Sequence, residues 1–336
     1  MLERKNVIFV VKGEAGKGLG HCYRALTVAA ALGDDVAPHF VLTPGSEPGL
    51  RFMQGRAPQQ SELAASHVEL TALLKRLQPD LIINDVLNTT AAYMTTQPEL
   101  GVPIVNFEDL GAGGLLADRV INAVYSGHAN QRERYGHEYM DIRPAFFDQR
   151  KPVVTLNPEV RKVLLTFGGE DPSDITRKVL QVVAANPLLA RIHYKVALGP
   201  AYAHRQAVEA LIAEQQLNAE IFVNTDIAGL MAQVDLAVIA NCRTVFEAAF
   251  MRIPAVVISA NERECLHTFY RTARYPYCGN INLIDPALID NAMLQLVTDF
   301  PLRQHIVAGL QQLDIDHGLE RITREIRMLL RLDCPV

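Results

Sequence analysis

Short apolar runs alternate with helix-like segments along almost the whole chain of 336 residues. Continuous apolar strands that are separated by amphipathic helices are typical of parallel sheets covered on both faces. The sequence therefore predicts an α/β protein. The expected strands lie at residues 7–11, 36–42, 81–83, 103–105 and 119–121, and at 162–166, 193–198, 220–223, 236–239 and 255–258.

These strands form two series, and each series begins with a strand that runs into a glycine loop. A stretch with three prolines and several charges, at residues 144–160, separates the two series and favours a domain boundary. We expect Rossmann-like domains at residues 1–150 and 151–317, facing each other across a cleft. Residues 318–336 are expected to form an amphipathic C-terminal helix that could pack back on the first domain.

Composition excludes several classes of protein. The formal net charge is −5 and no block of basic residues occurs, so we expect no nucleic-acid partner. Five scattered cysteines without a C-x-x-C pair indicate neither a zinc site nor a disulfide framework, and we expect no metal or cofactor. No apolar run approaches the roughly 20 residues that cross a bilayer, and the first one is too short for a secretory signal. We therefore expect a cytoplasmic protein.

The loop after the first expected strand carries four glycines and leads into an apolar helix. Neither the dinucleotide pattern G-x-G-x-x-G nor the phosphate loop G-x-x-x-x-G-K-[ST] fits this segment. His21 stands directly after Gly20, where a strand, a loop and a helix meet. A neutral imidazole there could take a proton from water. Arg24 lies one turn further and could face the same cleft, or form a surface salt bridge.

Two loops of the second half repeat this strand–loop–helix arrangement. Gly168 and Gly169 follow one strand and could line a ligand site, or simply form a tight turn. Arg243 follows another strand, where free helix amides and a guanidinium would suit a diphosphate. Glu247 could accept hydrogen bonds from ribose hydroxyls, or be an exposed helix carboxylate. The neighbouring Cys242 is interpreted as a small packing residue.

Two carboxylates, Asp85 and Asp109, each follow a strand of the first half. Both stand where a group that orients a substrate belongs, because ligands of open parallel sheets bind beyond the carboxyl ends of the strands. Each could equally cap the next helix.

Together these loops resemble the UDP-sugar hydrolase family of pseudaminic acid biosynthesis (the PseG family), which is similar to glycosyltransferase-B enzymes. The resemblance covers roughly residues 6–290. Four segments carry it: GLGHCYRALTVAAAL, DIRPAFF, VLLTFGGEDPSDITRKVL and NCRTVFEAAFMRIPAVVI. Three departures concern the site: Asn241-Cys242-Arg243 replaces the family's Gly-Gly-Ser, Asp85-Val86-Leu87 lacks its tyrosine, and Asn261-Glu262 replaces its Asn-Gln pair.

The resemblance, together with the positions argued above, gives a role to each candidate residue. The catalytic residues would be His21, which activates water for attack at the anomeric carbon, and Asp85. The groups on the nucleotide would be Gly20, Gly168, Gly169, Phe222 (near the uracil), Arg243, Thr244 and Glu247 (on the ribose). The groups that orient the substrate would be Arg24, Asp109 and Asn261.

The implied function is hydrolysis of a UDP-activated amino-deoxy sugar, without a metal, to give UDP and the free sugar in nonulosonate or surface polysaccharide biosynthesis. The alternative is an inverting glycosyltransferase that uses a nucleotide sugar on the same fold. A third possibility is a binding or regulatory subunit without catalysis, against which the intact glycine loop with His21 argues.

Overall fold

The computed structural model describes residues 4–14, 19–57, 60–151 and 155–332. Gly16 and Gly18 of the predicted first loop lie outside the described residues. The chain forms two compact units. One contains the chain up to Asp141 together with the segment from Asp316 onward, and the other runs from Ile142 to Ile315. The division at Asp141 falls before the boundary that the sequence suggested at residue 150.

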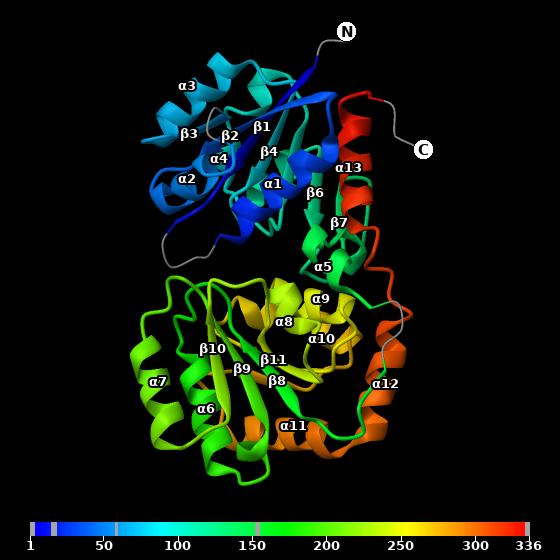
Figure 1. The fold of residues 1–336 in the computed structure, drawn as a ribbon. Helices are drawn as coiled ribbons and strands as arrows, with labels where there is room; N and C mark the ends of the chain where they lie inside the picture. Colours follow the sequence, from blue (N-terminus) through cyan, green and yellow to red (C-terminus); the bar gives the residue numbers. More distant parts are fainter. Residues whose placement is uncertain (1–3, 15–18, 58–59, 152–154, 333–336) are drawn as a thin grey trace. The chain divides into compact units, whose positions relative to one another are not determined.

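The first unit is built on a seven-stranded parallel sheet with the strand order β3-β2-β1-β4-β5-β6-β7 (Figure 1). The order reverses between β1 and β4, so the loops after these two strands meet at the switch point of the sheet. The strands are β1 (Lys5–Val11), β2 (Val36–Leu42), β3 (Ser61–Leu63), β4 (Leu81–Asp85), β5 (Ile104–Phe107), β6 (Arg119–Asn122) and β7 (Glu133–Tyr135).

Helices cover both faces of this sheet because successive residues of β1 are apolar on both sides. Phe9 belongs to a core with residues of α1 and α13, whereas Ile8 packs with α3. The helices of this unit are α1 (Gly20–Leu32), α2 (Glu47–Gln54), α3 (His67–Leu77), α4 (Ala91–Met94) and α13 (Gly318–Leu329), with short 3-10 turns η2 (Pro98–Leu100), η3 (Ala112–Leu116) and η4 (His137–Tyr139).

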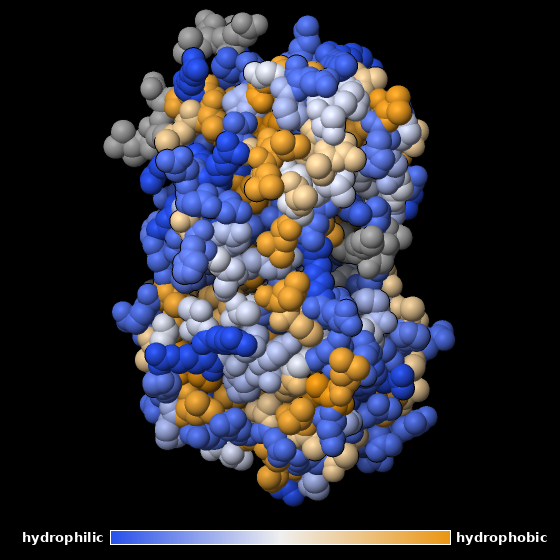
Figure 2. Space-filling model, turned by 180° about the vertical axis from the view of Figure 1, so that it is seen from behind, coloured by the Kyte–Doolittle hydropathy of each residue, from blue (hydrophilic) through white to orange (hydrophobic). Residues whose placement is uncertain are grey.

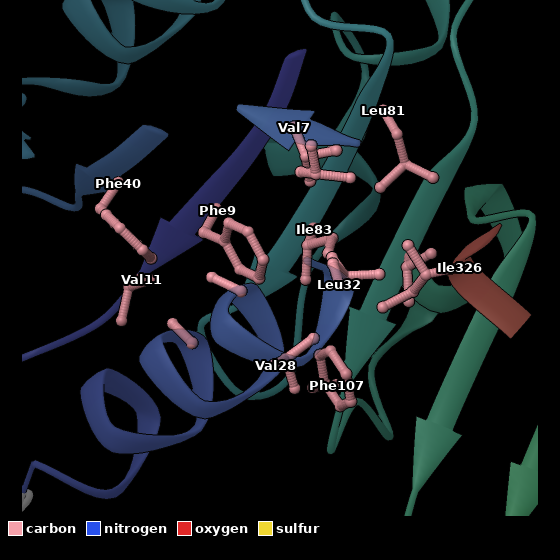
Figure 3. Packing of buried hydrophobic residues seen from close by; sticks show 14 of the residues in the cluster. Val7, Phe9, Val11, Val28, Leu32, Phe40, Leu81, Ile83, Phe107 and Ile326 are labelled. Carbon is pink, nitrogen blue, oxygen red and sulfur yellow. The ribbon is translucent and has the colours of Figure 1, made fainter. Parts of the chain in front are cut away.

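The C-terminal helix α13 packs on α1 and completes the core of the first unit. Ile326 is fully buried and lies near Leu32 of α1 (Figure 3). Gly318 at the start of α13 contacts the backbone of Met140, and a Cβ atom at this position would lie 2.1 Å from the Met140 carbonyl oxygen. Arg327 adds an ion pair with Asp35, 2.8 Å long.

The second unit contains a six-stranded parallel sheet with the order β10-β9-β8-β11-β12-β13, which reverses between β8 and β11. Helix α6 packs against α7 and α11, and α9 packs on β11 and β12. The strands are β8 (Lys162–Thr166), β9 (His193–Leu198), β10 (Ala219–Val223), β11 (Leu236–Ala240), β12 (Ala255–Ser259) and β13 (Tyr277–Asn280). The helices are α5 (Pro144–Gln149), α6 (Ile175–Ala185), α7 (Arg205–Glu214), α8 (Ile227–Met231), α9 (Arg243–Phe250), α10 (Phe269–Thr272), α11 (Pro286–Thr298) and α12 (Phe300–Leu310), with η5 (Leu189–Arg191) and η6 (Glu264–Leu266).

The predicted fold class, two α/β domains with parallel sheets, is confirmed, and each predicted apolar run lies on a strand. Three short strands at sheet edges, β3, β7 and β13, were not predicted. Their sequences contain no continuous apolar run, because an edge strand is only partly covered. On the face of the molecule in Figure 2, hydrophobic and hydrophilic residues are intermixed over both units.

Candidate active site

The switch point of the first sheet brings two of the predicted site residues together. His21 lies in the first turn of α1, after the loop that follows β1, and Asp85 is the last residue of β4. The Nδ1 atom of His21 lies 2.6 Å from Oδ1 of Asp85. The Asp85 side chain is buried, whereas the His21 side chain keeps 13% of its surface exposed. The imidazole thus has one edge on a buried carboxylate and another toward solvent.

Asp85 is held in its ionised form, and this fixes the tautomer of His21. Burial alone would raise the pKa of this carboxyl group, but the charge and hydrogen bonds of Arg24, with a further contribution from His21, bring the pKa far below its usual range. An ionised carboxylate only accepts hydrogen bonds. The Nδ1 atom of His21 must therefore carry the proton in the contact with Asp85, which makes Nε2 the nitrogen that can accept a proton from a ligand.

Arg24 lies one turn after His21 and is occupied by carboxylates of the protein. Its Nε and Nη2 atoms donate to the two oxygens of Asp85 at 2.7 and 2.6 Å, and its Nη1 atom donates to Glu108 at 3.0 Å. The side chain is only 3% exposed. It is therefore neither a surface salt bridge nor a group open to a substrate, and we expect it to act through Asp85.

Glu108 is a site residue that the sequence analysis missed, because it selected the adjacent Asp109. The structure gives Asp109 a different surrounding: its carboxylate accepts hydrogen bonds from the backbone and hydroxyl of Thr89, from Asn106 and from the backbone of Gly111, at 2.6–2.9 Å. The Asp109 side chain is buried, and its carboxylate is already bound by these four donors of the protein itself. We therefore interpret Asp109 as the residue that organises the loops after β4 and β5.

The switch point of the second sheet brings together the loops after β8 and β11. Gly168 follows β8 with a φ of +86°, a left-handed conformation that strains other residues, and Gly169 continues this exposed turn. Arg243 and Thr244 begin α9 after β11. The preceding Cys242 gives α9 no side-chain cap, and burial raises the pKa of its thiol to about 12, which agrees with a packing residue.

The two helices that begin at this switch point differ in how their first amides are used. In α6 the carboxylate of Asp171 accepts hydrogen bonds from the amides of Ile175 and Thr176, both at 2.8 Å. In α9 the N-cap residue Cys242 makes no capping hydrogen bond through its side chain, and no acidic residue lies in the first turn. An anion at this edge of the sheet would therefore meet fewer competing carboxylate contacts at α9 than at α6.

Glu247, the candidate for binding ribose, has a partner that sequence reasoning missed. Its Oε1 atom accepts hydrogen bonds from Nε and Nη2 of Arg143, at 3.1 and 2.9 Å, and the residue is 7% exposed. Arg143 belongs to the DIRPAFF segment, so two of the motifs singled out from the sequence are in direct contact. Glu247 is therefore not the exposed helix carboxylate that was its alternative interpretation.

Three candidates remain, and the loop that holds Asn261 is hydrogen-bonded to this switch point, since Ser173 donates to the Ala260 carbonyl at 2.8 Å and Asn241 to the Glu264 carbonyl at 2.7 Å. Phe222 is on the edge strand β10, half-buried, with the Lys195 ammonium 4.9 Å from its ring centroid. Asn261 lies in the loop after β12, and its side-chain oxygen accepts a hydrogen bond from the amide of Glu264 at 3.0 Å. Gly20, the remaining candidate, is the first residue of α1 in the first unit.

Clustered metal ligands and membrane-spanning helices are both absent from the residues that the structure describes. Within them, no group of three or more His, Cys, Asp or Glu side chains is arranged to hold a metal ion. Over the same residues, the helices are too short or too polar to span a bilayer.

Comparisons with known proteins show similarity in sequence to two proteins and similarity in fold to several solved structures. No family model matches the sequence. The chain is 27% identical over 318 residues to the spore coat polysaccharide biosynthesis protein SpsG of Bacillus subtilis, covering 91% of this chain and 93% of that protein. It is also 26% identical over 284 residues to an uncharacterized protein of Methanocaldococcus jannaschii, covering 79% of this chain and 58% of that protein.

Solved structures match at lower sequence identity but over nearly the whole chain. MurG of Acinetobacter baumannii superposes with a TM-score of 0.69 at 13% identity, covering 96% of this chain and 99% of MurG. The calicheamicin glycosyltransferase CalG4 gives 0.63 at 13% identity, with 99% and 100% covered. A co-structure of MnaA from S. aureus with UDP gives 0.65 at 13% identity, with 98% of both chains covered. The chain thus has the two-domain, parallel-sheet α/β fold of these proteins, which is the glycosyltransferase-B fold.

Proposed function

We propose that this protein is an enzyme of polysaccharide biosynthesis that breaks the bond between the sugar and the diphosphate of a nucleotide sugar. The observation that carries the proposal is the 2.6 Å contact between His21 and the buried Asp85 at the switch point of the first sheet. Such a pair is suited to general base catalysis, because the carboxylate orients the imidazole and stabilises the imidazolium that forms. The similarity to SpsG and to a fold that includes CalG4 supports this class of reaction.

In the proposed mechanism Nε2 of His21 takes the proton from an attacking hydroxyl group. The oxygen of that group forms a bond to the anomeric carbon while the bond from this carbon to the diphosphate oxygen breaks, with inversion. The electron pair leaves with the nucleoside diphosphate, and the proton stays on His21 until solvent removes it. Asp85 remains ionised throughout, since Arg24 offsets its charge.

We assign the leaving group to the second unit. The uncapped first turn of α9 and the guanidinium of Arg243 would receive the diphosphate charge. Thr244, Gly168 and Gly169 surround the same switch point, and Glu247 is assigned to the ribose and Phe222 to the base. UDP is the favoured nucleotide because a protein of this fold, MnaA, has been solved with UDP.

Glycosyl transfer is the reaction we favour. Several solved structures of this fold are named as glycosyltransferases, including CalG4, WaaG and a spinosyn rhamnosyltransferase. In that reaction the attacking group is a hydroxyl of an acceptor sugar or other alcohol. Hydrolysis is the second candidate, because the segments GLGHCYR and TFGGEDPSDIT resemble those of the PseG hydrolases. The same His21 would then deprotonate water.

One experiment distinguishes the two reactions. The protein is incubated with a panel of UDP-sugars, including UDP-linked amino-deoxy sugars, in water enriched in oxygen-18, with and without acceptor sugars. Release of UDP only with an acceptor, and unlabelled sugar in the product, supports transfer. Heavy oxygen on the free sugar without an acceptor supports hydrolysis. Heavy oxygen on UDP means attack at phosphorus and contradicts the role given to His21.

A further inference from the structure

A second carboxylate stands behind the catalytic pair of the first unit. Glu108 accepts a hydrogen bond from Nη1 of Arg24 at 3.0 Å, on the side of the guanidinium that does not contact Asp85. Glu108 is 4% exposed, Arg24 is 3% and Asp85 is 1%. The order of contacts is therefore Glu108, Arg24, Asp85 and His21, with only the last of these reaching solvent.

The net charge of the side chains behind His21 depends on Glu108. Arg24 and Asp85 alone would form a neutral pair, and Nη2 of Arg24 lies only 3.4 Å from Nδ1 of His21. A proton on the imidazole would then meet a nearby positive group with little net negative charge to balance it. With Glu108 included, Arg24 and the two carboxylates carry a net charge of about −1, which favours the imidazolium form.

The backbone of Glu108 adopts a strained conformation that fixes the position of its side chain. Its φ is +50°, a left-handed conformation that residues other than glycine rarely adopt. Its amide donates to the carbonyl of Ile121 at 3.0 Å, and its Oε2 atom accepts from the amide of Val124 at 3.4 Å. The following residue, Asp109, is fixed by its four donors. Such strained residues persist where the surrounding structure determines them, often at functional sites.

We propose that Glu108 is a positioning residue for proton transfer: it holds Arg24 and supplies the negative charge that makes the Asp85–His21 pair an effective base. This inference rests on the proposed function of His21. Glu108 does not touch a substrate in this account. It acts through Arg24 and Asp85.

Other charged groups near these four side chains stay unchanged when Glu108 is replaced. Asp141 lies close enough to Arg24 to favour its charged form. Lys12 and Glu14, in the loop after β1, form an ion pair with each other at 3.0 Å. Any effect of changing Glu108 is therefore measured against the same background.

The test replaces Glu108 by glutamine, which keeps the shape and removes the charge. We expect kcat to fall about tenfold, a part of the 10²–10⁴-fold that general base catalysis contributes. We also expect the acid limb of the pH profile of kcat/KM to move to lower pH. His21 acts as a base only when it is unprotonated, and without the negative charge of Glu108 its protonated form is less stabilised. KM for the nucleotide sugar should stay within about twofold. As a matched control, Glu62→Gln removes a carboxylate that pairs with Arg76 at the surface and should leave the rate and the pH profile unchanged.

The outcomes separate this inference from the proposed function. If His21→Asn turns over at the wild-type rate, the proposed function is wrong. If His21→Asn is inactive but Glu108→Gln keeps the wild-type kcat, or loses activity with an unmoved acid limb, the inference about Glu108 alone is overturned. Should Glu108→Gln fail to fold, Glu108→Asp decides: it keeps the charge and should keep the acid limb while kcat falls a few-fold. An unchanged kcat, or a loss equal to that of His21→Asn, would then contradict the proposal.

Discussion

Replacement of Asp85 by asparagine is the most informative single perturbation of the first unit. Asp85 is 1% exposed and accepts two hydrogen bonds from Arg24 and one from His21, at 2.6–2.7 Å. Asparagine keeps one carbonyl oxygen but places an NH2 group where the second oxygen was. That group would face an N–H donor, and the buried guanidinium would lose one of its two carboxylates.

The size of the effect follows from this burial. Removing one partner of a buried ion pair costs about 3–5 kcal/mol of unfolding free energy. In a unit of this size each kcal/mol lowers the Tm by about 2–4 °C. The transition of the first unit should therefore fall by about 6–20 °C, measured by differential scanning calorimetry of wild type and variant.

The control for this experiment is Glu62→Gln, whose ion pair with Arg76 is exposed on both sides. Exposed pairs contribute about 0–1 kcal/mol, so the control should shift the Tm by no more than a few degrees. If Asp85→Asn melted within about 2 °C of wild type, or no lower than the control, the buried ion pair of Asp85 would not stabilise the first unit as described.

Three further predictions concern acid stability, the C-terminal helix and the thiol of Cys242. Because folding lowers the pKa of Asp85, the contribution of this carboxylate to stability is present above its unfolded pKa of about 3.9 and is lost as the pH falls below that value. Asp85→Asn should therefore lack this part of the acid dependence of Tm between about pH 4 and 2. An identical acid dependence in variant and wild type would contradict this prediction. Ile326→Ala, at a fully buried position of α13, should lower the unfolding free energy by about 2–5 kcal/mol in urea titrations. Met328 is 59% exposed, so Met328→Ala should change the unfolding free energy by less than about 0.5 kcal/mol. Equal effects of the two substitutions would show that α13 does not pack as described. With its pKa raised to about 12, Cys242 should stay unlabelled by iodoacetamide at pH 8 in the native protein, as read by peptide mass spectrometry, and rapid labelling would contradict the raised pKa.

The strands of both sheets were predictable because parallel strands buried on two faces leave a continuous apolar signal. Phe9 and Ile8 in β1 pack on opposite faces of one sheet, so both positions must be apolar. The edge strands β3, β7 and β13 carry no such signal. The sequence Glu133–Tyr135 of β7 is polar and half-exposed, and only its pairing with β6 defines it as a strand.

The proximity of His21 and Asp85 was predictable, because the loop after β1 leads to His21 and β4 ends at Asp85, and both lie at the switch point of the first sheet. The contacts of Arg24 were not, because the spacing of an arginine on a helix does not reveal which carboxylates lie behind it. Glu108 and Asp109 are adjacent in sequence, yet a left-handed φ at Glu108 sends the two side chains to different partners. A single sequence cannot distinguish such neighbours.

The role of His21 as the general base is tested by comparing catalysis with binding in His21→Asn. Turnover of the UDP-sugar identified in the panel and the Kd of UDP would be measured for the variant and for wild type, with Glu62→Gln as control. If His21 is the base oriented by Asp85, kcat should fall by at least about 10²-fold while the Kd of UDP stays within about twofold. Wild-type turnover in the variant would contradict the account.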